Sequence, residues 1–318
     1  MRVAVVGAGA MGSIYAAALV EAGHDVALLD VSEARVREIR ADGLVLTRGG
    51  AEHVVRVPAT TDPTEIGHVD MAVVLVKGYH TRAAMELARP LVGGDTSFLS
   101  LQNGWGNGDE LARAVGEDRV LVGVSYHSAA ATGDGRIAHT NEGVTKIGPL
   151  VGTDLRRAER FANALRSGGL ACDVTASIRE EAWKKLTLNT AALPTAALTS
   201  LRAIMLTEPP MWPLVSGIAR ETLSVGKALG FKLDDAAEVE HVREVLVAAD
   251  QAKASMLQDV ERGRRTEIDT INGAVVRIGE EHGIVVPLNR AMVALLHGFE
   301  RSRETRDAEP AATPGSSR

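Results

Sequence analysis

A glycine-rich turn near the amino terminus constrains the fold more than any other feature of this sequence. Residues 2–6 form a short apolar run typical of a buried strand, and Gly-Ala-Gly-Ala-Met-Gly follows it directly, before an alanine-rich helical pattern. Glycines at the first, third and sixth positions of such a turn allow a tight bend, close approach of a pyrophosphate and close helix packing, which predicts a Rossmann dinucleotide site. The expected cofactor-binding residues of the turn are Gly7, Ala8, Gly9, Ala10, Met11 and Gly12.

The rest of the chain divides into a half that alternates strands with helices and a half that is mainly helical. Further buried strands are predicted at residues 26–29, 71–76, 96–99 and 120–125. A Gly-Asp-Gly turn at 133–135 predicts a hairpin, and we expect it and a strand at 145–147 to close the sheet. Helices are predicted at 154–167, 177–191, 211–229 and 266–282.

These patterns predict two domains and a tail. Residues 1–150 are expected to form an α/β Rossmann domain with a doubly wound parallel sheet, because helices alternate with buried strands. Residues 151–302 are expected to form an all-α domain that carries the substrate and catalytic groups. Residues 303–318 lack apolar periodicity, so we expect a disordered tail that is dispensable for chemistry.

Composition and charge exclude several classes of function. A net charge of -6 leaves no basic face for nucleic acid, and no apolar run approaches the ~20 residues needed to span a bilayer. The single cysteine, Cys172, cannot form an internal disulfide and fits a reducing compartment, with no targeting segment ahead of the first strand. No His, Cys and carboxylate cluster has metal-ligand spacing, so no metal is expected. We therefore expect a cytoplasmic protein with a small-molecule ligand.

Asp30 follows the second predicted strand, about twenty residues after the glycines. A carboxylate there accepts hydrogen bonds from the ribose hydroxyls of the adenosine and repels a 2′-phosphate. NAD(H) is therefore favoured over NADP(H), which stays open because Arg35 and Arg37 are near enough to reach a phosphate. Asp30 also has a purely structural interpretation, as the cap of a helix that begins near Ser32.

Further segments, taken with the glycine turn, resemble the ketopantoate reductase (2-dehydropantoate 2-reductase) family from residue 1 to about residue 292. They are Val-Lys-Gly-Tyr-His-Thr at 76–81, Leu-Gln-Asn-Gly-Trp-Gly at 101–106, Trp-Lys-Lys-Leu-Thr-Leu-Asn at 183–189, Ser-Met-Leu-Gln-Asp at 255–259 and Thr-Glu-Ile-Asp at 266–269. The resemblance implies an NAD(P)-dependent oxidoreductase acting on CH–OH groups, which reduces the 2-oxo acid ketopantoate in pantothenate biosynthesis. It also implies a homodimer formed through the helical domain.

The resemblance assigns roles to residues on both domains. Lys77 and Asn103 follow predicted strands, at the sheet edge where ligands bind, and by resemblance they hold the nicotinamide end of the cofactor and the substrate beside it. Lys185 and Asn189 are four residues apart and share one helix face. We expect Lys185 to be the general acid that protonates the developing alkoxide, with burial lowering its pKa toward about 7–8. By resemblance Asn189 and Ser255 bind substrate and Glu267 orients the reacting hydroxyl and the lysine.

One position departs from the family pattern. Leu193 stands where the family commonly has a second asparagine that recognises the polar groups of the substrate. Leu193 precedes Pro194, so the helix is expected to end or kink there and the leucine to pack in the core, or else to lie against the substrate. An NAD-linked D-2-hydroxy acid dehydrogenase for a more apolar 2-oxo acid is therefore an alternative. From another class, a non-catalytic dinucleotide-binding sensor is a second alternative, because a glycine turn alone does not imply catalysis.

Overall fold

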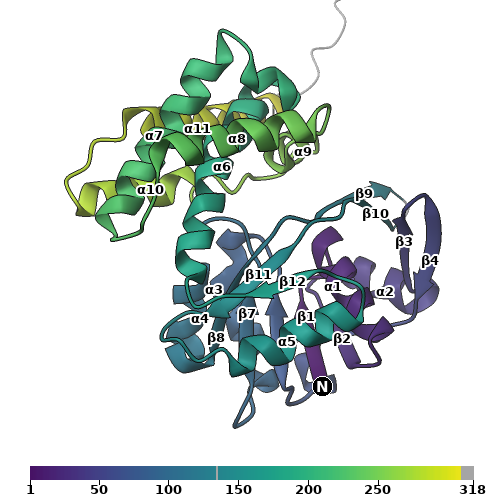
Figure 1. Cartoon of the computed structure of the whole chain (residues 1–318). Helices are drawn as coiled ribbons and strands as arrows, with labels where there is room; N and C mark the ends of the chain where they lie inside the picture. Colours follow the sequence, from purple (N-terminus) through teal and green to yellow (C-terminus); the bar gives the residue numbers. More distant parts are fainter. Residues whose placement is uncertain (134, 309–318) are drawn as a thin grey trace, which may run out of the picture. The chain divides into compact units, whose positions relative to one another are not determined.

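The computed structural model describes residues 1–133 and 135–308, and its fold confirms the predicted class (Figure 1). The chain forms two compact units that divide between Trp183 and Lys184. The first unit is an α/β domain built on a parallel sheet. Within the described residues, the second unit contains helices and no strand.

An eight-stranded sheet with the order β12-β11-β8-β7-β6-β1-β2-β5 forms the centre of the first unit. Neighbouring strands run parallel except at β11, which is antiparallel to β8. The strands are β1 (Arg2–Val6), β2 (Asp25–Leu29), β5 (Ala59–Thr60), β6 (Met71–Val74), β7 (Ser97–Ser100), β8 (Val120–Ser125), β11 (Thr145–Pro149) and β12 (Cys172–Val174). The helices of this unit are α1 (Ala10–Glu21), α2 (Glu33–Asp42), α3 (Thr81–Leu87), α4 (Asn107–Val115) and α5 (Arg156–Ser167).

Both faces of this sheet are covered, which explains why its strands read as continuous apolar runs. Alternate side chains of β1 enter two different cores. Val3 and Val5 pack in a core with side chains of α1 and α5. Ala4 and Val6 pack in a second core with side chains of α3 and α4. The carboxyl end of β1, where the glycine turn begins, is therefore packed on both faces of the sheet.

Residue 134 lies outside the described residues, but antiparallel pairing of the flanking strands confirms the hairpin predicted at 133–135. The hairpin does not close the main sheet, whereas the strand predicted at 145–147 joins that sheet within β11. The strands of the hairpin, β9 (Ser128–Gly133) and β10 (Arg136–Asn141), belong to a second sheet with the order β4-β3-β10-β9. The partners β3 (Leu44–Arg48) and β4 (Ala51–Val55) were not predicted, and the first four residues of β4 are exposed, which weakens its strand signal. The parallel pairing of Ile137 with Leu46 joins segments about ninety residues apart, and local sequence does not encode it.

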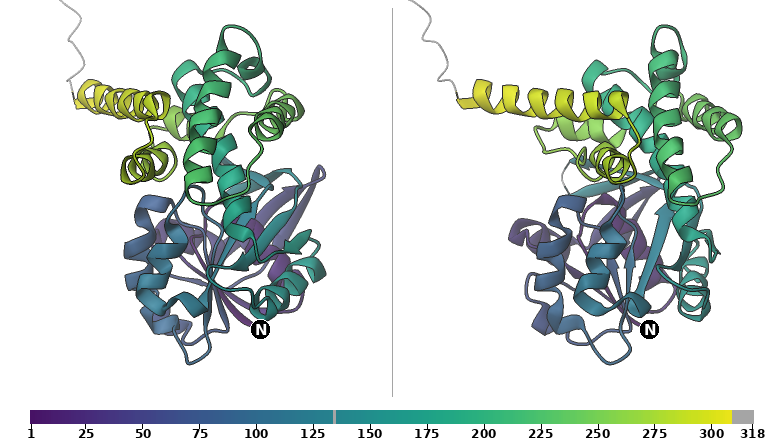
Figure 2. Two further views of the ribbon diagram at one scale, coloured as in Figure 1. Left: turned by 60° about the vertical axis from the view of Figure 1, so that its left-hand side comes forward. Right: turned by 90° about the vertical axis from the view of Figure 1, so that its left-hand side faces the viewer.

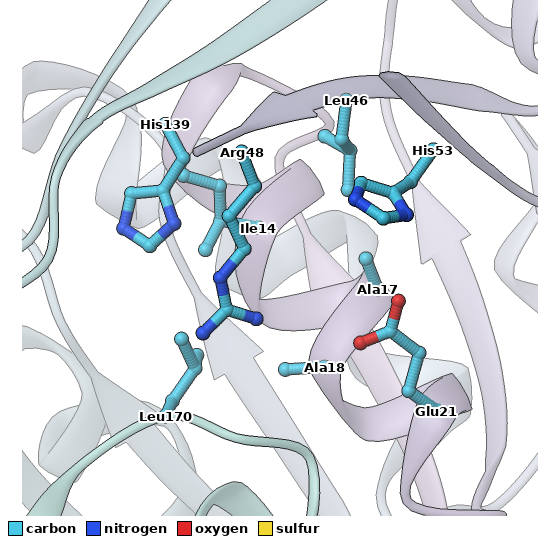
Figure 3. A pocket seen from close by; sticks show the side chains of 9 residues that line it. All are labelled: Ile14, Ala17, Ala18, Glu21, Leu46, Arg48, His53, His139 and Leu170. Atoms are coloured by element: carbon cyan, nitrogen blue, oxygen red, sulfur yellow. The ribbon is translucent and has the colours of Figure 1, made fainter. Parts of the chain in front are cut away.

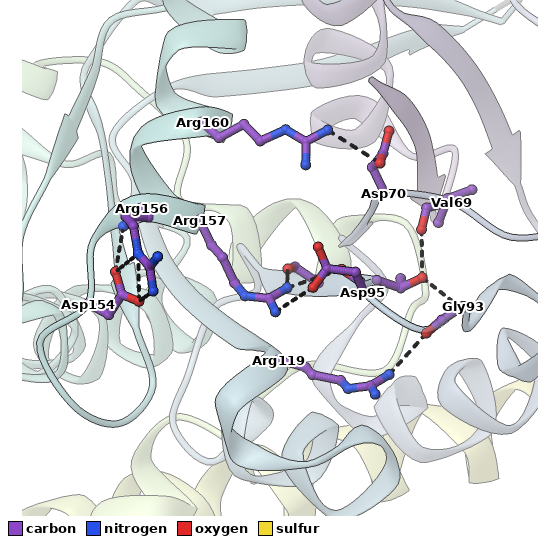
Figure 4. A network of polar contacts seen from close by, with 11 residues as sticks. Val69, Asp70, Gly93, Asp95, Arg119, Asp154, Arg156, Arg157 and Arg160 are labelled. Atoms are coloured by element: carbon purple, nitrogen blue, oxygen red, sulfur yellow. Dashed lines mark hydrogen bonds and ion pairs between the residues drawn. The ribbon is translucent and has the colours of Figure 1, made fainter.

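Residues 151–183 lie with the first unit, whereas the sequence placed the domain boundary at residue 150. Strand β12 pairs with β11, and α5 packs beside it. Arg157 of α5 pairs with Asp95 at 2.7 Å and Arg160 pairs with Asp70 at 3.3 Å (Figure 4). These two aspartates precede β7 and β6, so α5 is anchored to the amino ends of the sheet strands.

In its described residues, the second unit is built from α-helices and one short 3-10 helix, Ile204–Thr207 (Figure 2). The α-helices are the part of α6 (Ile178–Thr199) from Lys184 onward, α7 (Met211–Ala228), α8 (Asp235–Ala249), α9 (Ser255–Glu261), α10 (Asn272–Glu281) and α11 (Pro287–Ala308). A core formed by side chains of α6, α7, α8, α9 and α11 includes Ile218, Leu223 and Val242. None of the helices in the described part of the chain is both long and apolar enough to cross a membrane.

Two helix ends differ from the prediction. Helix α10 begins at Asn272, not at residue 266, and the chain before it forms turns. Helix α11 continues to Ala308, so residues 303–308, predicted to belong to a disordered tail, are helical. The rest of that predicted tail lies outside the described residues.

Helix α6 was expected to end or kink at Leu193; it does not end there but continues through Pro194 to Thr199. Proline has no backbone N–H, so the carbonyl of Thr190, four residues earlier, loses its helical donor. The Nδ2 of Asn272 donates a 3.0 Å hydrogen bond to that carbonyl. Asn272, fully buried, thus replaces the missing donor, and it packs within the helical core as predicted.

Candidate active site

The glycine turn between β1 and α1 has the geometry of a phosphate cradle. Gly7 has a φ of +103°, and a side chain on Gly12 would place its Cβ 1.9 Å from the Gly7 carbonyl oxygen. A Cβ on Gly9, in contrast, would meet no atom within 4 Å. Gly9 is also the N-cap of α1, with no side-chain cap and no acidic residue in the first turn. The amino terminus of α1 therefore offers N–H groups and open space to an anionic ligand.

Asp30 bridges the end of β2 and this turn. Its Oδ2 accepts a 2.7 Å hydrogen bond from the Ala8 N–H, and its Oδ1 accepts a 2.9 Å bond from the Ser32 N–H. Ser32, and not Asp30, caps α2, because its hydroxyl accepts from the Arg35 N–H. Asp30 is half-buried beside the cradle, where a ribose would extend from a bound pyrophosphate.

Arg35 and Arg37 are both engaged by protein groups. Arg35 donates to the Ala8 carbonyl at 3.2 Å and to the Gly135 carbonyl at 3.0 Å, and it pairs with Glu38 at 2.6 Å. Arg37 is exposed and pairs with Glu33. The sequence placed both arginines within reach of a 2′-phosphate, but Arg35 would have to give up bonds to the turn in order to bind one.

Gln102 joins the two loops that carry Lys77 and Asn103. Its Nε2 donates to the Val76 carbonyl at 3.0 Å and to the Thr81 hydroxyl at 2.7 Å. Lys77 and Asn103 are both half-buried. They follow the adjacent parallel strands β6 and β7, as predicted, and so lie in neighbouring loops. The polar link through Gln102 was not recognised in the sequence, although it precedes Asn103 directly.

The loop after β7 is also fixed by aromatic packing within the first unit. Trp105 lies edge-to-face against Trp183, with ring centroids 4.7 Å apart, and the Arg179 guanidinium lies 4.8 Å from the Trp105 ring centre. Trp183 is fully buried. Such pairs add about 0.5–1.5 kcal/mol beyond burial, so the loop that carries Asn103 is held firmly.

Lys185, Asn189 and Glu267 all belong to the second unit, and the charges of Lys185 and Glu267 interact. Lys185 and Asn189 lie one turn apart on α6, which confirms their shared face. Glu267 and Asn189 are buried, with 6% and 8% of their surface exposed. Burial lowers the pKa of Lys185 to about 8, and the negative charge of Glu267 opposes that shift. A lysine of this kind can give up and regain a proton near neutral pH.

Ser255 and Leu193 differ from these residues in exposure. Ser255 is the first residue of α9 and is exposed. Leu193 is half-buried on α6, whereas its neighbour Pro194 is buried. No hydrogen bond within the described residues joins Ser255 to Lys185 or Glu267, so its predicted contact with substrate stays a prediction.

Two other features of the first unit involve none of the candidate site residues. A small pocket in the first unit lies between α1 and the second sheet, where Arg48 donates to Glu142 and to the Gly169 carbonyl (Figure 3). Cys172 is buried, and burial raises the pKa of its thiol to about 12, so it behaves as the buried apolar residue that was expected. In the described part of the chain, no group of three or more His, Cys, Asp or Glu could hold a metal ion.

Comparison with known proteins decides the family. The model "Ketopantoate reductase PanE/ApbA" matches residues 3–152, and its C-terminal counterpart matches residues 177–300. The chain is 35% identical to a 2-dehydropantoate 2-reductase of Halobacterium salinarum over 304 residues, which cover 95% of this chain and 99% of that protein. The chain belongs to the ketopantoate reductase family. It is accordingly an NAD(P)-dependent oxidoreductase that acts on CH–OH groups.

Solved structures of this family and its neighbours share the fold. A ketopantoate reductase of Ralstonia eutropha JMP134 superposes with a TM-score of 0.88 at 31% identity, covering 96% of this chain and 100% of that one. A ternary structure of D-mandelate dehydrogenase with NADH and anilino(oxo)acetate superposes with a TM-score of 0.91 at 25% identity and the same coverage. The NADH in that complex supports dinucleotide binding by this member of the ketopantoate reductase family.

Proposed function

We propose that this chain reduces a 2-oxo acid to a 2-hydroxy acid, with Lys185 as the general acid and NADH as the preferred reductant. The observation that carries this proposal is the lowered pKa of Lys185, about 8, close to the buried Glu267. In the leading form of the proposal the substrate is ketopantoate, as for the curated relatives.

NADH, when bound, would supply the hydride for the carbonyl carbon of the substrate. The open space at Gly9 and the uncapped start of α1 fit its pyrophosphate, and Asp30, Lys77 and Asn103 are proposed to hold the rest. As negative charge grows on the carbonyl oxygen, Lys185 Nζ donates a proton to it, and solvent later returns that proton. Glu267 holds the lysine and the new hydroxyl in position. Ser255 and Asn189 are proposed to hold the substrate.

Leu193 favours a second candidate substrate class. It places an apolar side chain where the family commonly has an asparagine, and the D-mandelate dehydrogenase complex is similar in structure over 96% of this chain. A site that leaves a substrate hydroxyl against leucine loses about 1–3 kcal/mol, so a branched or aryl 2-oxo acid would be preferred. This alternative is a D-2-hydroxy acid dehydrogenase that uses the same general acid, Lys185, and the same glycine turn for the cofactor.

The test is oxidation of NADH and of NADPH, followed in parallel by absorbance, with ketopantoate and with bulkier apolar 2-oxo acids. Fast turnover of ketopantoate supports the leading form, and turnover of the apolar acids alone supports the dehydrogenase. If the cofactor binds but none of the 2-oxo acids is reduced, the catalytic roles proposed for Lys185 and Glu267 are wrong. The non-catalytic sensor then becomes the better hypothesis. A Lys185→Ala variant that kept full turnover would likewise exclude Lys185 as the acid.

A cytoplasmic location, a role in pantothenate biosynthesis and a homodimer are further parts of this proposal, and they rest on the family resemblance. The homodimer is checked by light scattering of the purified chain, where the mass of one 33.5 kDa chain would contradict it.

A further inference from the structure

The last helix of the second unit holds the segment that carries Glu267. Three side chains of α11 reach this segment. Glu300 Oε1 accepts a 2.7 Å hydrogen bond from the Thr266 N–H, and Arg303 Nη1 donates a 3.0 Å bond to the Val260 carbonyl. His297 Nε2 lies 2.8 Å from Asp269 Oδ1. The contacts flank Glu267 on both sides along the chain.

The spacing of the three residues places them on one side of the helix. Positions 297, 300 and 303 follow one another at steps of three residues, so their side chains are neighbours along α11. Arg303 also lies over Gly263, where an added Cβ would be 2.8 Å from Arg303 Nη2. The glycine thus lets α11 pack directly on the turn that leads into the Glu267 segment.

The chain that leads into Glu267 has little regular structure of its own. Residues 262–271 lie between α9 and α10; the Glu267 carbonyl accepts from the N–H groups of Thr270 and Ile271, whereas residues 264–266 belong to no turn or helix. Thr266 is nevertheless 99% buried, and a buried N–H without a partner costs about 1–3 kcal/mol. Glu300 supplies that partner from 34 residues further along the chain.

We propose that Glu300 and Arg303 are positioning residues of the reaction, which fix Glu267 beside Lys185, so that α11 is part of the catalytic apparatus. This inference rests on the proposed roles of Lys185 and Glu267. A helix that only stabilised the fold would not affect turnover. A helix that positions Glu267 does, because a small displacement of an orienting group lowers turnover strongly.

The pH profile of reduction separates positioning from stability. Glu267 raises the pKa of Lys185 against the effect of burial, so a displaced Glu267 leaves the lysine with a lower pKa. Two other charged contacts involve residues close in sequence to Lys185 and Glu267. Lys184 Nζ lies 3.7 Å from Glu238 of α8, and Asp269 pairs with Arg265. Neither contact is altered by the variants below.

The variants are Glu300→Ala, Glu300→Gln and Arg303→Ala, with Arg301→Ala on the same helix as the control. Glu300→Ala should lower kcat about 10- to 100-fold, leave the KM for NADH unchanged, and move the midpoint of the pH profile downward. Glu300→Gln keeps an acceptor for the Thr266 N–H and should recover most of kcat. Arg303→Ala should act in the same direction as Glu300→Ala, and Arg301→Ala should match the wild type.

Hydrogen exchange of the peptide that covers residues 260–269 gives a readout without turnover. Faster exchange in Glu300→Ala than in Glu300→Gln is expected. A lower melting temperature with unchanged kcat, midpoint and exchange would overturn the proposal. If Glu300→Ala does not fold, the pH profile and the hydrogen exchange of Arg303→Ala test the proposal in its place. If the wild type reduces no 2-oxo acid, the proposed function fails, and the exchange result still shows whether α11 orders the Glu267 segment.

Discussion

The Asp30 carboxylate accepts a 2.7 Å hydrogen bond from the backbone N–H of Ala8, in the middle of the glycine turn. A single side chain thus ties the end of β2 to the cradle. A carboxylate has about four acceptor positions, and the bonds from Ala8 and Ser32 use two of them. The remaining positions are available to ribose hydroxyls, so the brace and the proposed cofactor contact can coexist.

Asp30→Asn should reduce the preference for NADH over NADPH about tenfold. The amide keeps one acceptor oxygen for the turn but no longer repels a 2′-phosphate, and a tenfold change corresponds to about 1.4 kcal/mol. The measurement is the ratio of the two dissociation constants, from quenching of protein fluorescence. Asp25→Asn, which removes an exposed charge at the other end of β2, is the control. An unchanged ratio in Asp30→Asn would show that its charge does not select the cofactor.

Alanine at Gly9 and at Gly12 should have opposite effects. Gly9→Ala places a methyl group in open space with a φ of -70°, so the fold should tolerate it while dinucleotide affinity falls. Gly12→Ala drives a Cβ to within 1.9 Å of the Gly7 carbonyl, and overpacking of this kind costs about 1–3 kcal/mol. Urea unfolding and NADH titration of both variants test this. Equal stability of the two would contradict the geometry.

The rate of 2-oxo acid reduction should fall as pH rises through about 8. Reduction requires Lys185 in its protonated form, and its pKa of about 8 sets the midpoint. Oxidation of the 2-hydroxy acid requires the neutral lysine and should rise over the same range. Profiles of kcat in both directions check the sign. Two profiles that fall together would assign the proton transfer to another group.

Lys185→Met should be more stable than the wild type at pH 7 although it is inactive. The folded-state pKa, about 8, lies below the ordinary value of 10.5, so the folded chain binds fewer protons than the unfolded chain between these pH values. Stability of the wild type therefore increases from pH 8 to about 10.5, and the advantage of Lys185→Met shrinks over that window. Urea unfolding at pH 7 and pH 10 measures it. A constant difference would argue against a buried cation.

Leu193→Asn should shift selectivity toward ketopantoate. A hydrogen bond regained by a substrate hydroxyl, with its desolvation relieved, is worth about 1–3 kcal/mol, or about 5- to 150-fold in relative kcat/KM. The ratio of kcat/KM for ketopantoate and for an apolar 2-oxo acid is the readout. Leu198→Asn, another half-buried leucine of α6, is the control. If both variants give the same ratio, Leu193 does not line the substrate site.

The sequence predicted the architecture wherever pattern and position are local. Strand β1, the glycine turn and the start of α1 are continuous in sequence, and the structure has them as expected. The helical spacing of Lys185 and Asn189 is local too, so their shared face was correctly predicted. Each of these features depends on residues within one or two turns of each other.

Features that depend on distant partners were missed. Parallel pairing of β3 with β10 joins residues 46 and 137, and neither segment shows which strand it will meet. The engagement of Arg35 by the Gly135 carbonyl spans 100 residues, so the arginine appeared available for a phosphate. Glu300 was not singled out, because no helix was predicted after residue 282 and its partner is a backbone N–H that carries no side-chain signal.

The replacement of a helical donor by Asn272 has a consequence for the order of folding. The carbonyl of Thr190 obtains its donor from a residue 82 positions later in the chain. During synthesis the second half of α6 will therefore emerge with a gap in its hydrogen-bond ladder, which closes only when Asn272 has left the ribosome and docked. We expect the first unit to be folded well before then, and the face that carries Lys185 to be completed among the last parts of the molecule.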